Sequence, residues 1–414
     1  MNNVVHNFDF VENGSVSSPA GFTAAGITAG LKKSGKPDFA MLFSEQDCNV
    51  AGTFTSNLFP AAPVQYCRER VSAGSKIRAV IVNSGVANAC TGKEGYTNTV
   101  RSAEETAAVL GIKPENVLTA STGRIGVQLP MDLISKGIRT AAAGLSADGG
   151  IAASHAIMTT DTKPKSIAIS FDIQGKRVTI GGMTKGAGMI APGMIVCRPH
   201  ATMLCFLTTD AEISANDLSL LLESAVEQSF NRITVDNDMS TNDTCVLLAN
   251  GVSGVKIQAG TEDAETFRKA LVVVTQHLAR AMVLDGEGST KFVTVEVKGA
   301  ATPGDARLCA RAIADSMLCK TAWFGCDPNW GRVLAAAGYS GATFDPEKVT
   351  LDYDEMPVVR GGMDAGTPES ELCTVMKRRD FTIHLNLGAG DCTHTVWTSD
   401  ISHDYVTINA DYHT

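Results

Sequence analysis

Apolar residues occur in two patterns that alternate almost throughout this sequence, short continuous runs and stripes of helical period. The run 77–82 predicts a short buried strand that ends at the polar turn Asn83-Ser-Gly85. Across residues 97–110 the apolar positions fall on one helical face, and Gly111 and Pro114 are expected to end that helix. The first half of the chain therefore combines strands and helices.

The same alternation continues in the second half. Ser214 is expected to cap a helix whose apolar stripe runs from Leu218 to Val226. Further strands are predicted over 203–207, 245–249 and 292–297, and further helices over 262–282 and 306–317. Between the halves, the glycine-rich tract 181–193 cannot be regular structure over its whole length. The predicted fold class is α/β, or α+β, with layered sheets and helices.

Composition narrows the function classes. The 414 residues are 44% hydrophobic and 19% charged, which is typical of a globular protein, and about 150 residues per domain predicts two or three domains. No apolar run approaches the roughly 18 residues of a membrane span. The net charge of −9 argues against a nucleic-acid partner, and the N-terminus resembles no secretory signal, so a cytoplasmic protein is expected. Eleven cysteines without a Cys-x-x-Cys pair predict free thiols and no metal site.

Familiar catalytic motifs are absent or out of context. Gly186-Ala-Gly-Met-Ile-Ala191 matches a dinucleotide-binding pattern, but Pro192 and Gly193 follow where a helix should begin. The eight histidines show no local signature of a Ser/His/Asp hydrolase.

What remains is a set of short clusters that contain small hydroxyl or amide residues, glycine or both, at 83–88, 121–126, 158–162, 185–189, 200–204 and 240–244. Each cluster alone is typical of a turn or a cap. A Ser or Thr also serves as a nucleophile when the chain is cut before it, because the freed α-amine then acts as its base. Thr202 follows the glycine-rich tract and precedes a predicted strand, where such a cut is plausible, but these residues alone do not select it.

A resemblance does select Thr202. Eight segments carry it, and they follow one another in this order along the chain: 121–123, 156–162, 185–192, 201–204, 240–244, 285–288, 325–332 and 405–412. Through these segments the sequence, from about residue 19 to residue 414, resembles the ornithine acetyltransferase (glutamate N-acetyltransferase, ArgJ) family of arginine biosynthesis.

The resemblance implies an N-terminal-nucleophile fold with stacked sheets flanked by helices, and self-cleavage between Ala201 and Thr202. The products would be an α chain, 1–201, and a β chain, 202–414. Thr202 would be the nucleophile, and the Thr122 hydroxyl with the Gly123 N–H would form the oxyanion hole. The implied substrate contacts are Thr160, Lys185, Thr202, Glu287, Asn409 and Thr414. The ordinary alternatives are a solvated lysine at 185, a turn at 287 and a frayed tail at 409–414.

The implied activity is transfer of the acetyl group from N2-acetyl-L-ornithine to L-glutamate through an acetyl-Thr202 enzyme, with ping-pong kinetics. The family also allows acetyl-CoA as a donor; no bound cofactor and no metal are implied. The expected partners are these small molecules and the α and β chains themselves, paired as a heterotetramer, with no nucleic acid or membrane.

One segment departs from the family. The usual Pro-Asn-Met-Ala-Thr is replaced here by a longer stretch from Pro192 to Thr202, which would become the free end of the α chain. Two alternatives remain at this point, a related self-processing aminopeptidase and an uncleaved, non-catalytic metabolite binder.

Overall fold

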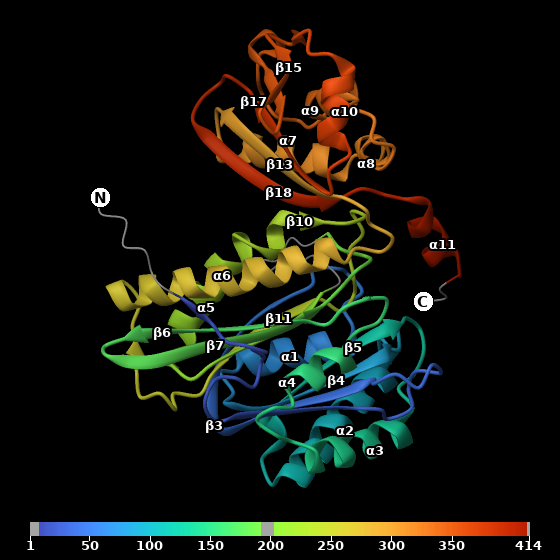
Figure 1. Cartoon of the computed structure of the whole chain (residues 1–414). Helices are drawn as coiled ribbons and strands as arrows, with labels where there is room; N and C mark the ends of the chain where they lie inside the picture. Colours follow the sequence, from blue (N-terminus) through green and yellow to red (C-terminus); the bar gives the residue numbers. More distant parts are fainter. Residues whose placement is uncertain (1–7, 192–202, 412–414) are drawn as a thin grey trace. The chain divides into compact units, whose positions relative to one another are not determined.

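The computed structural model describes residues 8–191 and 203–411, which form two compact units. The first unit contains 8–191, 203–231 and 238–282, and the second contains 232–237 and 283–411 (Figure 1). Both units combine β-sheet with helices, so the predicted α/β class with layered sheets and helices is confirmed.

The first unit is built on a nine-stranded sheet in the order β1-β6-β7-β8-β11-β3-β4-β5, with β2 paired to β3. The long strand β3 joins the two halves of this sheet, because its first part pairs with β2 and β4 and its last part pairs with β11. The strands are β1 (Asp9–Phe10), β2 (Phe22–Ile27), β3 (Phe39–Phe54), β4 (Ile77–Val86), β5 (Val117–Arg124), β6 (Lys165–Ile173), β7 (Lys176–Lys185), β8 (Leu204–Thr209) and β11 (Thr244–Ala249). A separate small pair is formed by β9 (Glu212–Ile213) and β12 (Lys256–Ile257).

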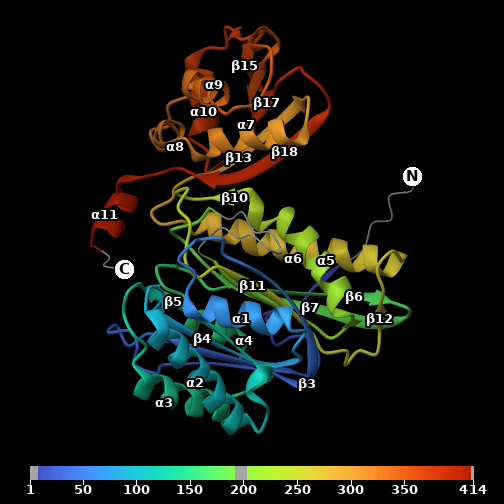
Figure 2. The ribbon, with the colours of Figure 1, turned by 180° about the vertical axis from the view of Figure 1, so that it is seen from behind.

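Helices cover the faces of this sheet (Figures 1 and 2). They are α1 (Ala62–Ser72), α2 (Gly92–Leu110), α3 (Met131–Ala143), α4 (Gly150–Ala156), α5 (Ala215–Glu227) and α6 (Glu262–Leu284), with the short 3-10 helices η1 (Pro114–Asn116) and η2 (Phe230–Arg232). Ile134 and Ile138 of α3 pack with Phe39 on one face of the β2–β4 region. Helices α1, α2 and α4 contribute to a core that also contains residues of β8 and β11.

Helix α6 approaches the sheet closely at Gly182 of β7. A Cβ atom there would lie 2.9 Å from a methyl carbon of Leu278 and 3.4 Å from one of Val274. Gly182 is therefore the kind of residue that lets a helix rest directly on a strand. This contact explains why β7 runs through two glycines of the glycine-rich tract before regular structure ends at Lys185.

The second unit has a seven-stranded sheet in the order β10-β18-β13-β17-β14-β15-β16. Its strands are β10 (Ile233–Thr234), β13 (Phe292–Ala300), β14 (Thr350–Tyr353), β15 (Met356–Arg360), β16 (Met363–Asp364), β17 (Asp380–Asn386) and β18 (Cys392–Ser399). Its helices are α7 (Pro303–Asp315), α8 (Met317–Phe324), α9 (Trp330–Gly338), η3 (Pro346–Lys348), α10 (Glu369–Met376) and α11 (His403–Asp411). Its core includes Trp323, Tyr353 and Phe381.

Most elements predicted from periodicity are confirmed, with ends shifted by a few residues. Gly111 ends α2 in the left-handed conformation, with φ 66°, and the Ser214 side chain caps α5 by accepting the N–H of Asp217. The helix predicted over 306–317 is confirmed as α7, but it ends earlier than expected, at Asp315. The Ser316 hydroxyl accepts the N–H of Cys319 and begins the separate helix α8 as its N-cap.

The predicted cut between residues 201 and 202 lies outside the described residues, so the division into α and β chains stays a prediction. The compact units follow a different division. Strand β7, before the cut, pairs antiparallel with β8, after it, within one sheet of the first unit.

Two further features concern the described residues alone. Six of their cysteines are buried, and none of them forms a disulfide. None of their helices is both long and apolar enough to cross a bilayer.

Candidate active site at one edge of the first sheet

Strand register brings several polar residues to one edge of the sheet, where β7 ends and its neighbours β8 and β11 begin. Leu204 at the start of β8 pairs with Lys185 at the end of β7 and with Thr244 at the start of β11. Met203 and Asp243, each one residue before those strands, therefore lie at this edge together with Lys185. The edge adjoins the predicted nucleophile along the chain, because Met203 directly follows Thr202.

Thr122 and Lys185 are in contact. The Lys185 Nζ donates a hydrogen bond to Thr122 Oγ1 over 3.4 Å, and both residues are almost fully buried. Thr122 lies near the end of β5, followed by Gly123. The structure thus brings a predicted oxyanion-hole residue and a predicted substrate-binding cation into one place, although their strands are far apart in the sheet order.

Gly123 occupies a position that other residues tolerate poorly. Its φ is +128°, and a Cβ atom there would lie 2.3 Å from the carbonyl carbon of Gly85, its partner on β4. Gly85 also has a positive φ, of +120°. The close pairing of two glycines fixes the backbone at the end of β5, next to the Thr122 hydroxyl.

A buried ion pair supports the loop that begins after Lys185. Asp161 Oδ1 accepts the N–H of Gly186 at 2.7 Å and the ammonium of Lys165 at 2.6 Å. Burial alone would raise the pKa of the Asp161 carboxyl, but Lys165 and Lys185 hold that pKa well below its usual range. Asp161 therefore stays ionised and ties the glycine-rich loop to the start of β6. Thr160, the predicted substrate contact beside it, is half-buried.

Three of the polar clusters in the sequence are joined by hydrogen bonds around Ser121, the residue before Thr122. Asn242 Nδ2 donates to the carbonyl oxygens of Ser121 and Ala87, at 2.7 and 2.6 Å. The Ser121 hydroxyl in turn donates to Asn83 Oδ1 at 2.6 Å. These buried bonds connect the ends of β4 and β5 to the segment before β11, so the clusters at 83–88, 121–126 and 240–244 form one framework.

Lys32 is a second lysine with an electrostatic link to this region. The carboxylate of Asp38 accepts the backbone N–H groups of residues 29–32 and so fixes the loop that carries Lys32. Burial lowers the pKa of Lys32 to about 8, while the nearby carboxylates of Asp38 and Asp161 oppose that shift and Lys185 adds to it. No motif in the sequence points to Lys32, because its proximity to Asp161 arises only in the folded chain.

In the second unit the structure brings together two other predicted residues. Asn409 Nδ2, on α11, donates to Glu287 Oε2 at 2.7 Å, and the Glu287 side chain is buried. The neighbouring Gly288 has a positive φ of +65°, and its carbonyl oxygen accepts the Ser402 hydroxyl at 2.6 Å. The tail is thus helical and attached to the Glu287 turn. Ala201, Thr202 and Thr414 lie outside the described residues.

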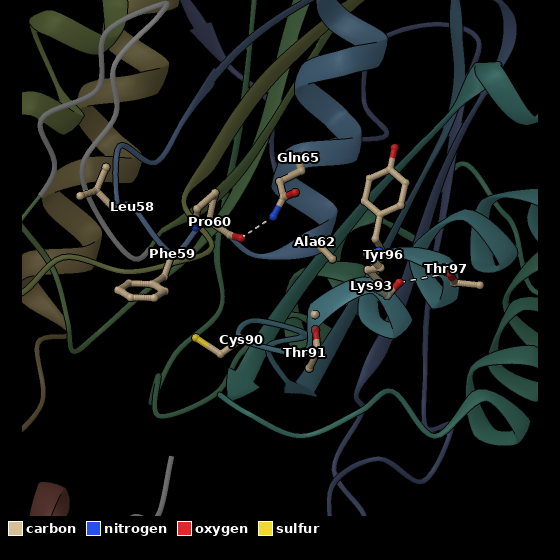
Figure 3. A pocket seen from close by; sticks show the side chains of 11 residues that line it. Leu58, Phe59, Pro60, Ala62, Gln65, Cys90, Thr91, Lys93, Tyr96 and Thr97 are labelled. Atoms are coloured by element: carbon tan, nitrogen blue, oxygen red, sulfur yellow. Dashed lines mark hydrogen bonds between the residues drawn. The ribbon is translucent and has the colours of Figure 1, made fainter.

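A hollow of about 620 Å³ opens in the first unit between the starts of α1 and α2 (Figure 3). Exposed Leu58 and Phe59 form part of its wall on the left of the view, Lys93 and Tyr96 line it on the right, and Cys90 lies between them. None of the predicted site residues lines this hollow. Within 8–191 and 203–411, moreover, no three His, Cys, Asp or Glu side chains gather as a metal site.

Comparison with known proteins identifies the family. The model of the ArgJ family matches residues 23–414. The chain belongs to the ArgJ family. A relative from Symbiobacterium thermophilum, "Arginine biosynthesis bifunctional protein ArgJ", is 49% identical over 97% of this chain and 99% of its own length. A "Glutamate N-acetyltransferase" from Methanocaldococcus jannaschii is 45% identical over 98% of this chain and all of its own length.

Solved structures of ArgJ-family proteins are also similar in sequence. A chain of the ornithine acetyltransferase from Mycobacterium tuberculosis, solved with ornithine, is 41% identical, is covered completely and corresponds to 46% of this chain, with a TM-score of 0.43. A chain of the arginine biosynthesis bifunctional protein from Bacillus halodurans is 39% identical over the same share, with a TM-score of 0.44.

Three charged residues around the predicted site of this ArgJ-family chain were not predicted from its sequence. Asp161 and Asp243 lie within segments that carry the family resemblance, and Lys165 follows one of these segments, but the resemblance implies no role for the three residues. Asp243 is completely buried, and burial raises the pKa of its carboxyl well above the usual range, against the opposing effects of the Met203 N–H and Lys185. An acidic residue flanked by Asn and Thr before an apolar strand was the available signal.

Proposed function

We propose that this protein moves the acetyl group of N2-acetyl-L-ornithine to L-glutamate through an acetyl-Thr202 intermediate, releasing ornithine and regenerating N-acetylglutamate. Membership of the ArgJ family supports the reaction class. The observation that carries the proposal for this chain is the contact between Lys185 and Thr122, because Lys185 lies at the same sheet edge as Met203, the residue after Thr202.

The direction of that hydrogen bond matters for the reaction. An ammonium group can only donate, so Thr122 Oγ1 accepts from Lys185 and its own hydroxyl proton is free to point elsewhere. A hydroxyl held in this way can donate to the oxyanion that forms when a nucleophile attacks the acetyl carbonyl. One such donor typically contributes about 3–4 kcal/mol to stabilising the transition state.

The chemistry of the transfer requires a free Thr202 amine. Thr202 Oγ attacks the acetyl carbon while its α-amine takes the hydroxyl proton, and that proton then passes to the departing nitrogen of ornithine. Glutamate attacks the resulting ester in the second half-reaction. Before cleavage the Thr202 nitrogen is an amide, which is not basic enough to accept the proton.

Intact-mass measurement and Thr202→Ala test this proposal. Dividing the 43.5 kDa chain in proportion to 201 residues and the remaining 213 gives chains of about 21 and 22 kDa, and the second should begin Thr-Met-Leu-Cys-Phe. Thr202→Ala should leave an uncut chain without acetyl transfer to glutamate. Full activity in a homogeneous 43.5 kDa chain, or release of peptides in place of acetyl transfer, would contradict the proposal.

Three finer points belong to the same proposal. Acetyl-CoA serves as an alternative donor, which acetylation of glutamate without N-acetylornithine would test. The α and β chains assemble as a heterotetramer in the cytoplasm, which native mass and cell fractionation would test. The chains are expected to separate only on denaturation, because β7 and β8 on either side of the cut share a ladder of backbone hydrogen bonds.

A further inference from the structure

The loop after β2 holds Lys32 on a rigid backbone. Asp38 Oδ1 accepts the N–H of Ala29 at 2.6 Å, and Oδ2 accepts the N–H groups of the next three residues at 3.1, 2.6 and 2.9 Å. The Asp38 carboxylate is completely buried. Four backbone donors on one buried carboxylate leave the loop little freedom, so the backbone of Lys32 is fixed in place.

The same loop is attached to the strands that carry Thr122. The carbonyl oxygen of Asp38 accepts the N–H of Ser84 at 2.9 Å, and Ser84 is the residue of β4 that pairs with Thr122. A Cβ atom at Gly85 would lie 3.5 Å from the carbonyl oxygen of the residue before Lys32. The loop therefore packs beside the end of the β4–β5 pair, where the proposed oxyanion hole lies.

The Lys32 ammonium has capacity for a ligand. An ammonium has three donors, and within the described part of the chain Lys32 uses one, to the Pro37 carbonyl oxygen at 2.7 Å, and forms no ion pair. Asp161 attracts Lys32 electrostatically, but its two oxygens already accept the ammonium of Lys165 and two backbone N–H groups. The Lys32 side chain is partly exposed, so a solute can reach it.

Lys32 and Lys185 are two cations that act on each other. Lys185 lowers the pKa of Lys32, which means that the two positive charges repel one another. Asp161 interacts with both lysines, but its charge is already balanced by direct contact with Lys165. An anionic ligand bound beside Lys32 and Lys185 would relieve this repulsion.

We propose that Lys32 selects a dicarboxylic amino acid as the acetyl acceptor, by binding the side-chain carboxylate of glutamate. The inference rests on the proposed function. Glutamate and N-acetylornithine both have an α-carboxylate, for which Lys185 is the expected cation, but their side chains end differently. Glutamate ends in a carboxylate, whereas N-acetylornithine ends in an ammonium. A second cation near Lys185 thus matches the second carboxylate of glutamate and gains nothing from the side chain of ornithine.

Lys32→Met tests this role because it removes the ammonium and keeps most of the apolar stem. In a ping-pong reaction, kcat/KM for each substrate reports on the half-reaction of that substrate alone, so the two substrates can be examined separately. The kcat/KM for glutamate should fall roughly 10- to 100-fold, mainly through KM, which is the loss expected for one charge-assisted hydrogen bond. The kcat/KM for N-acetylornithine should not fall by more than about twofold.

Two further variants and a second acceptor serve as controls. Lys33→Met removes the same charge from the next residue, whose side chain is exposed, and should leave both values as in the wild type. Lys32→Arg keeps the cation and should retain most of the kcat/KM for glutamate. Glutamine has the shape of glutamate without its side-chain charge. The wild type should therefore prefer glutamate to glutamine, and Lys32→Met should lose most of this preference.

Several results would overturn the proposal. Equal losses for both substrates in Lys32→Met would mean that Lys32 serves the shared α-carboxylate or the fold. An unchanged kcat/KM for glutamate, an equal loss in Lys33→Met, or a loss in Lys32→Arg as large as in Lys32→Met would also contradict it. The proposed function fails differently, if the wild type transfers no acetyl group from N-acetylornithine to glutamate.

Discussion

The side chains of Asp161 and Asp243 are both buried in the first unit, yet their surroundings are opposite. Asp161 binds an ammonium directly and a backbone N–H with the same oxygen, and its pKa is held low by Lys165 and Lys185 against the effect of burial. Asp243 binds one backbone N–H, and burial raises its pKa. Burial and the charge of Lys185 act on both carboxyls, so the directly bound Lys165 is what distinguishes Asp161 from Asp243.

The comparison separates two uses of a buried acid. Asp161 has its counter-ion within the folded chain, in Lys165, and serves to hold the loop after Lys185. Asp243 holds the Met203 N–H, has one oxygen without a hydrogen-bond partner and forms no ion pair among the described residues. One buried acid is therefore balanced by a cation, whereas the other is a backbone acceptor whose negative charge is disfavoured by burial.

The largest expected effect is a loss of stability when Asp161, the carboxyl with a counter-ion, is replaced. Asp161→Asn leaves Lys165 buried without its counter-ion, and breaking a buried pair in this way should lower the free energy of unfolding by about 3–5 kcal/mol. Denaturant unfolding measures this. Asp9→Asn is the control, because the ion pair of Asp9 with Arg177 is well exposed to solvent and should be worth less than about 1 kcal/mol. Equal losses in the two variants would contradict the comparison.

A smaller loss of stability is expected when Lys165, the cation of the same ion pair, is replaced. Lys165→Met removes a charge-assisted hydrogen bond worth about 1.5–3 kcal/mol but leaves Lys185 to oppose the charge of Asp161. The stability that Asp161 contributes is present above its unfolded pKa of 3.8 and is lost as the pH falls below it.

Because Lys165→Met raises the folded pKa of Asp161, acid unfolding should begin at a higher pH than in the wild type. Circular dichroism followed from pH 7 downward measures the midpoint. A midpoint equal to that of the wild type would mean that Lys185 alone determines the charge of Asp161.

Local patterns in the sequence were sufficient for much of the fold. Strand β4, the Gly111 stop of α2 and the Ser214 cap of α5 depend on residues close together in the chain, and each is confirmed. The break at Ser316 was missed because the apolar stripe continues through it, while a single hydroxyl begins a new helix there.

The site was less accessible to such reasoning. The resemblance supplied Thr122, Lys185, Glu287 and Asn409, and the structure pairs Lys185 with Thr122 and Asn409 with Glu287. The contact of Asp243 with Met203 could not be predicted, because it requires β8 and β11 to be parallel neighbours. No local pattern encodes that pairing.

The smallest effect concerns Asp243 in the uncut Thr202→Ala chain. The unfolded chain loses the Asp243 proton near pH 3.8, whereas the folded chain keeps it to a higher pH because the carboxyl is buried. Above pH 3.8 the folded state therefore binds more protons than the unfolded state. As a result the free energy of unfolding decreases as the pH rises, until the folded pKa is reached. The slope is at most about 1.4 kcal/mol per pH unit. Asn at this position cannot titrate. The unfolding free energy of Thr202→Ala minus that of Thr202→Ala with Asp243→Asn should thus decrease between pH 4 and pH 6, as measured by urea unfolding at each pH. A difference that stays constant would mean that Asp243 is already ionised before cleavage, and the contrast with Asp161 would then disappear.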